Sequence, residues 1–62
     1  MTQAERETTE KIRSAMQEQG RQIKWLAAEM KLPYDAMYRR LRGLTRFTAE
    51  EKEAAYKVLN IQ

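Results

Sequence analysis

Apolar residues in the first third of the chain recur at the three- and four-residue spacing that a helix uses to bury one face. The stripe consists of Thr8, Ile12, Ala15 and Met16. A capping box at Thr2–Glu5 allows a helix to begin early, although the stripe itself is clear only later. We therefore predict a firm helix over residues 9–19, with residues 1–8 frayed at its start. Gly20 follows, a residue suited to the left-handed position just past a helix end.

A second stripe with the same spacing predicts a helix over about residues 22–30. Its members are Ile23, Leu26, Ala27 and Met30. The chain then turns at Pro33, which has no backbone N–H to donate and disfavours helix in the residue before it. Proline is well tolerated at the first position of a helix, so we expect a third helix over about residues 33–42. Gly43 supplies its C-terminal stop.

The last helix is predicted from a second capping box, Thr48–Glu51, which places the first helical residue at Ala49. The helix should end near Leu59, and residues 60–62 are expected to form a frayed tail. The residues expected in the core of this part are Leu44, Phe47, Ala55, Val58 and Leu59.

These elements together predict a single all-α domain over residues 1–62, a compact bundle of four helices. No stretch shows sustained period-two alternation, so no strand is expected. The tightest connection joins the helices at 22–30 and 33–42. Two short helices separated by a turn of a few residues are the signature of a helix-turn-helix.

The composition argues against several classes of protein. The chain has neither cysteine nor histidine, so disulfides and the commonest metal ligands and general base are missing. No nucleophile with a base and no phosphate-cradling glycine loop is found, and we predict no enzyme activity, no cofactor, no metal and no small-molecule ligand. No secretory segment or transmembrane-length apolar run is visible, so the cytoplasm is the expected location, without a membrane partner.

The positive charge is concentrated in the middle of the chain. The net charge is +3, but residues 21–46 hold seven basic and two acidic side chains, a balance of +5. Residues 1–20 and 47–62 each carry a balance of −1. A basic middle between two acidic ends favours a polyanionic partner.

The third predicted helix separates a buried face from a polar one. At the helical repeat, Met37 and Leu41 point to the core, with Leu32 entering from the turn. The opposite face carries Asp35, Arg39 and Arg42, with Ala36 beside them, while Tyr34 and Tyr38 lie at one edge and Arg40 at the other. Such a face suits the DNA major groove, because arginine bonds guanine bidentately and a carboxylate accepts from cytosine N4.

Several residues have structural readings beside these functional ones, and for Tyr38, Arg39 and Arg42 the structural reading is a plain solvated face. Tyr34 either contacts DNA or caps the start of its helix, and Asp35 either meets a base or stabilises the first turn electrostatically. Arg40 is expected to pack its stem and to pair with a glutamate of the first or fourth helix. Trp25 points away from its stripe, and either packs over the first helix or near Tyr56, or marks a contact surface for a protein or a second copy.

The segment "QIKWLAAEMKLPYDAMYRRLRG", residues 22–43, resembles lambda-repressor-like (Cro and repressor type) helix-turn-helix domains. The similarity continues into "FTAEEKEAAYKVLNI" and covers most of the chain. The Leu26–Ala27 pair matches the family's buried leucine and small crossing residue, and Gly43 matches its closing glycine. There are also departures, because Lys31 stands where the family often has glycine, and Arg40 where it often has an aliphatic residue.

The resemblance implies a sequence-specific protein of double-stranded DNA, with the third helix in the major groove. The expected base contacts are Tyr34, Asp35, Tyr38 and Arg39. The expected phosphate contacts are Arg21, Gln22, Lys24, Lys31, Arg42, Thr45 and Arg46. Lys31 and Arg46 also have a plain reading as solubilising charges.

The expected role is a small Cro-like transcriptional repressor of a phage or mobile element, in a bacterial or phage-infected cell and associated with the nucleoid. A weak homodimer, or one formed on DNA, would bind a palindromic operator. The alternatives are an excision or recombination accessory factor, which needs the same DNA-reading module, and a helical protein-interaction module such as an antirepressor. An interaction module would be expected to expose more aliphatic surface and fewer arginines on the third helix.

Overall fold

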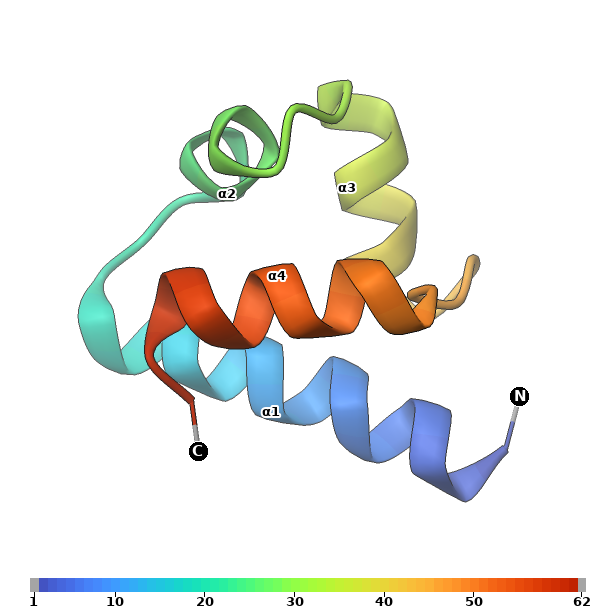
Figure 1. The fold of residues 1–62 in the computed structure, drawn as a ribbon. Coiled ribbons are helices and arrows are strands. Elements are labelled where there is room, and N and C mark those ends of the chain that lie inside the picture. The colour runs from blue at the N-terminus through green and yellow to red at the C-terminus, as the bar shows by residue number, and fades with distance from the viewer. Residues whose placement is uncertain (1, 62) are drawn as a thin grey trace.

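The computed structural model describes residues 2–61, in which four α-helices follow one another and no strand occurs (Figure 1). The helices are α1 (Gln3–Gln19), α2 (Ile23–Glu29), α3 (Tyr34–Leu41) and α4 (Ala49–Leu59). This arrangement confirms the predicted all-α bundle. None of the helices in the described part of the chain has both the length and the apolar character needed to cross a bilayer.

Two of the helices begin with capping boxes, as the sequence predicts. The Thr2 hydroxyl accepts a hydrogen bond from the Glu5 backbone N–H at 3.2 Å, and the Glu5 carboxylate accepts one from the Thr2 N–H at 2.8 Å. Thr48 and Glu51 repeat the pattern at 3.1 and 3.0 Å. These bonds satisfy backbone donors that have no partner inside the helix. Because Thr2 hydrogen-bonds its charged form, the Glu5 carboxyl has a lowered pKa.

The start of α1 differs from the frayed segment expected over residues 1–8. The helix is continuous from Gln3, and Thr8 and Thr9 are buried. Their hydroxyls donate to the carbonyls four residues earlier, at 3.0 and 3.1 Å, so the buried polar atoms are satisfied within the helix. Met1 and Gln62, which belong to the predicted frayed ends, lie outside the described residues.

All four helices end in the same way, with one residue in the left-handed region. These residues are Gly20 (φ 67°), Lys31 (φ 57°), Gly43 (φ 81°) and Asn60 (φ 58°). After each helix two successive backbone N–H groups return to carbonyls of the last turn; after α3, Gly43 donates to Arg40 and Leu44 to Arg39. This is the hydrogen-bond pattern of a Schellman motif. Lys31 is the residue of the four that is least suited to the conformation, since its Cβ clashes there and it lacks the short amide of asparagine.

Each helix contributes one large, fully buried side chain to a common core: Ile12, Leu26, Met37 and Leu59. Ala15, Met16, Ala27, Leu41, Phe47 and Ala55 complete the core, while Met30, Leu32 and Val58 pack against it from the edge. In Figure 1, α1 and α4 run side by side in the same direction, and α2 and α3 cover one side of this pair.

Three further details of the prediction are wrong. Leu44 was expected in the core but is 74% exposed: its backbone N–H closes the end of α3, and Phe47 is the buried side chain of this loop. Ile61 was expected in a frayed tail but packs against the core, and its N–H donates to the Tyr56 carbonyl at 2.8 Å. Pro33 is the extended N-cap of α3 (φ −62°, ψ 151°) rather than its first helical residue.

Candidate nucleic-acid interface

The helix-turn-helix consists of α2, a turn over residues 30–33, and α3. Two hydrogen bonds shape the turn: Lys31 N–H donates to Ala28 at 3.2 Å and Leu32 N–H donates to Ala27 at 2.9 Å. Pro33 then continues in an extended conformation, which ends the turn and starts α3 in a new direction. The core contacts of Leu26 and Met37 hold the two helices together, so the outward face of α3 is fixed by packing.

The outward face of α3 carries side chains with free hydrogen-bonding capacity. Asp35 and Arg39 are exposed, and neither forms an ion pair with another of residues 2–61. Tyr34 and Tyr38 are 52% and 39% exposed, and their rings stack with centroids 6.3 Å apart. The Arg42 guanidinium lies 5.6 Å from the centroid of the Tyr38 ring. The four predicted base contacts therefore share one surface, with the two tyrosines and Arg42 forming one edge.

Arg40 forms the other edge of α3 and has a different environment. Its Nε and Nη2 donate to the two carboxylate oxygens of Glu51 in α4, at 2.9 and 3.0 Å, and its Nη1 donates to the Ala36 carbonyl at 3.0 Å. Both side chains are largely buried, with 16% and 18% of their surface exposed. The hydrogen bonds from Arg40 lower the pKa of the Glu51 carboxyl, although burial opposes them. The expected structural role of Arg40, with a partner on the fourth helix, is confirmed.

The predicted phosphate contacts lie at both ends of α3 and at the start of α2. All are exposed: Arg21, Gln22, Lys24, Lys31, Arg42, Thr45 and Arg46. Gln22 is the N-cap of α2, but its side chain makes no capping hydrogen bond and is available to a ligand. Arg46 follows α3 and lies 3.7 Å from the Glu5 carboxylate of α1, so it is partly engaged within the protein.

Trp25 packs at the margin of the core and carries Arg21 on its face. The indole is half-buried against the core, and the Arg21 guanidinium lies 4.3 Å from the ring centroid. A cation over an aromatic face at this distance is attracted to the ring without losing its charge. Packing against the core therefore explains why Trp25 is half-buried. Its ring also orients Arg21, which we predict to contact phosphate.

Two residues of α1, Arg13 and Gln17, lie beside the predicted phosphate contacts without having been predicted as contacts themselves. They line an open groove of about 340 Å³ together with Arg21, Tyr38 and Arg42. The available signal was the position of Arg13 on the flank of α1, beside the buried stripe. The packing of α1 against α3 determines which residues this flank faces, and the buried stripe of α1 alone does not predict that packing.

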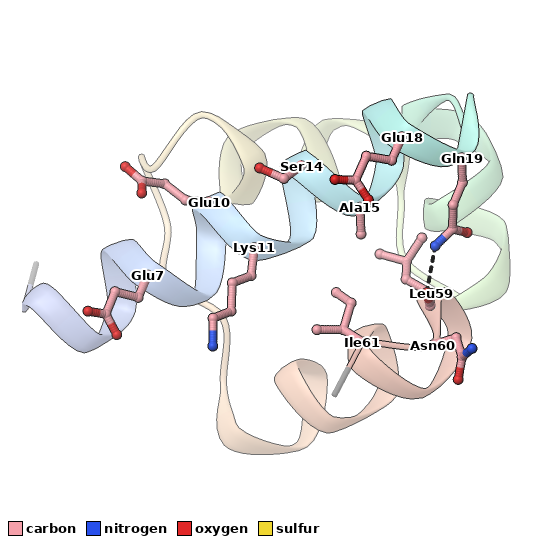
Figure 2. A pocket seen from close by; sticks show the side chains of 10 residues that line it. All are labelled: Glu7, Glu10, Lys11, Ser14, Ala15, Glu18, Gln19, Leu59, Asn60 and Ile61. Atoms are coloured by element: carbon pink, nitrogen blue, oxygen red, sulfur yellow. Dashed lines mark hydrogen bonds between the residues drawn. The ribbon is translucent and has the colours of Figure 1, made fainter.

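A larger hollow lies elsewhere and has the opposite charge. It has a volume of about 780 Å³ and lies between α1 and the C-terminal end of α4 (Figure 2). Glu7, Glu10 and Glu18 line it with Lys11, and Ile61 lies between the two helices. Within residues 2–61 no group of three potential ligands is arranged to hold a metal ion. The hollow gives the domain an acidic side, away from the outward face of α3, that would repel a polyanion.

Comparison with known proteins gives no significant match to this chain, among protein families, curated proteins or solved structures. The functional assignment therefore depends on the chain's own residues and their arrangement.

Proposed function

We propose that this protein binds double-stranded DNA sequence-specifically, with α3 in the major groove, and acts as a small Cro-like transcriptional repressor. The observation that carries the proposal is the contrast between the arginines of α3. Arg40 is bound bidentately by Glu51, whereas Arg39 is exposed and has no ion-pair partner among residues 2–61. The free guanidinium stands on a rigid helix and keeps its donors for a ligand.

The chemistry of the outward face fits base edges. Arg39 has the planar, forked donors that match the O6 and N7 acceptors of guanine, and the Asp35 carboxylate can accept from cytosine N4. The Tyr34 and Tyr38 hydroxyls add groups that both donate and accept at one edge. Such readout would give sequence choice, while the exposed cations and amides around α3 would hold the backbone and fix the register.

The alternative of a protein-interaction module has less support from this surface. The large apolar side chains exposed within residues 2–61 are Tyr34, Tyr38 and Leu44, and only the tyrosines belong to α3. Aliphatic anchors, which a helical docking face would require, are therefore missing from the outward face of α3. An excision or recombination accessory factor would use the same DNA contacts, and the location of the bound sequences separates it from a repressor.

A single domain of this size offers a small contact surface, about 600–1,000 Å² for one DNA-binding module. Two copies on a palindrome would double the contacts, with half-sites about one helical turn apart. We therefore propose that two copies bind together, either as a weak dimer or only on DNA.

The test is selection of bound sequences from a random duplex library with wild type, Arg39→Glu and Lys11→Glu. Both substitutions reverse one exposed charge, but Lys11 lines the acidic hollow on α1, away from α3. Wild type and Lys11→Glu should enrich the same short palindrome, and Arg39→Glu should lose it. If wild type enriches no sequence at either low or moderate salt, the proposal of sequence-specific DNA binding fails.

A further inference from the structure

We propose that the groove between α1 and α3 binds a backbone phosphate of one DNA strand, with Arg13 as a phosphate contact. We call it the arginine groove, formed by Arg13 and Gln17 of α1, Arg21 before α2, and Tyr38 and Arg42 of α3, over an apolar floor. The inference rests on the proposed DNA binding and adds to it a contact made by α1. The ligand is a phosphodiester of the duplex.

The groove has the charge that a phosphate requires. Three arginines line it and no acidic residue does. None of the three forms an ion pair with another of residues 2–61. Beyond Arg13 and Arg42 the surface continues into a second hollow that adds Arg6 and one acid, Glu10. The arginine groove therefore has a larger excess of positive charge than this second hollow, and than the shallow hollow in which Arg13 lies with Glu10, Ser14 and Gln17.

Two of these arginines are held in place by aromatic rings. Arg21 lies over Trp25 at 4.3 Å, and Arg42 lies over Tyr38 at 5.6 Å. Stacking restricts the side chain while the N–H groups at the edge of the guanidinium stay available to acceptors. Less conformational entropy is then lost when a phosphate binds, which favours binding at this groove over binding to freely moving surface lysines.

The position of the groove relative to α3 matches the position of a DNA strand. A helix with its side chains is about 10–12 Å across and the major groove is about 12 Å wide, so both edges of a docked helix face phosphate strands. At one edge of α3, Arg40 is neutralised by Glu51. At the other edge, Tyr38 and Arg42 open into the arginine groove. The strand on the α1 side should therefore receive the stronger contact.

Helix α1 offers a matched pair of positions for the test. Arg13 and Lys11 are both exposed and differ by two residues, which places them about 200° apart around the helix. Arg13 lines the arginine groove, whereas Lys11 lines the acidic hollow in Figure 2. Removing either side chain lowers the net charge of the protein equally, but only one removal should cost a phosphate contact.

The experiment measures affinity for a labelled duplex of arbitrary sequence over a range of salt concentrations, so that no operator is needed. With Arg13→Ala, the slope of log affinity against log salt should flatten by about one unit, whereas Lys11→Ala should leave it unchanged. Arg13→Lys keeps the charge and should retain most of the slope. Thermal unfolding of each variant checks that the fold is retained.

Several outcomes would overturn the inference. If wild type binds the duplex but Arg13→Ala and Lys11→Ala have equal slopes of log affinity against log salt, Arg13 makes no phosphate contact. The inference then fails, whereas the proposed DNA binding still stands. If wild type binds no duplex at any salt, the proposed function itself fails. A titration with inorganic phosphate at constant ionic strength, followed by Trp25 fluorescence, tests whether the groove binds a free phosphate ion. If wild type binds this ion saturably and Arg13→Ala does not change the salt slope of duplex binding, the groove binds a small phosphate ligand and the inference is wrong.

Discussion

Lys31 holds the turn between α2 and α3 in a conformation that suits glycine better. Its φ is 57°, and the other helix ends place glycine or asparagine at this position. In the left-handed region the Cβ atom of any larger residue crowds the following carbonyl oxygen. Lys31→Gly should therefore stabilise the protein, and it loses no packing because the lysine side chain is exposed.

The expected gain is the difference between two effects of opposite sign. The left-handed conformation costs a residue with a Cβ about 1–2 kcal/mol. Glycine also increases the conformational entropy of the unfolded chain, which lowers the free energy of unfolding by about 0.4–1 kcal/mol. The net stabilisation should be about 0.8 kcal/mol, which raises Tm by roughly 3–6 °C in a domain of this size.

Urea unfolding of Lys31→Gly and Lys31→Ala measures this difference. Both variants lose the same charge, and only alanine keeps the Cβ atom, so the comparison isolates backbone strain. If the glycine variant is no more stable than the alanine variant, the strain at this turn is not what the backbone angle indicates. Duplex affinity of the two variants should fall equally if Lys31 contacts phosphate, so stability and binding would change independently.

Three further predictions concern the contacts of α4. Arg40→Met should destabilise the protein by about 1–3 kcal/mol, because the largely buried Glu51 carboxylate loses its ion-pair partner. Urea unfolding in a double-mutant cycle with Glu51→Met measures the interaction free energy of the two side chains. Because the pKa of the Glu51 carboxyl is lowered, the stabilisation from this pair is present at pH values above the ordinary pKa of 4.5 and is lost as the pH falls through the folded-state pKa. If the free energy of unfolding of Arg40→Met depends on pH as strongly as that of wild type, this prediction is contradicted. Thr48→Ala should lower the free energy of unfolding by about 1 kcal/mol, because it removes the hydrogen bond that caps α4. The control Thr45→Ala, in the exposed loop, should change it by less than about 0.5 kcal/mol. Equal effects of the two substitutions on urea unfolding would refute the role of the cap.

The sequence alone predicted the helices because the signals that define them are local. A capping box places both of its partners within four residues, so Thr48 and Glu51 could be matched without knowing the fold. The buried stripes were equally clear, since the helical repeat places Leu26 or Met37 on one face whatever the neighbour. The outward position of Arg39 followed from the same geometry.

Only the tertiary structure decided which flank of each helix faces which neighbour. The sequence left Arg40 with a glutamate on either the first or the fourth helix, and the folded structure places Glu51 of α4 within hydrogen-bond distance of its guanidinium. The packing of α1 against α4 half-buried Ile61, and the packing of α1 against α3 turned the Arg13 flank of α1 toward Arg42. Leu44, which follows α3, stayed in solvent. A hydrophobic stripe determines that a helix packs, but the crossing angle depends on side chains of both helices together. The arginine groove therefore appears only when three separate segments are assembled.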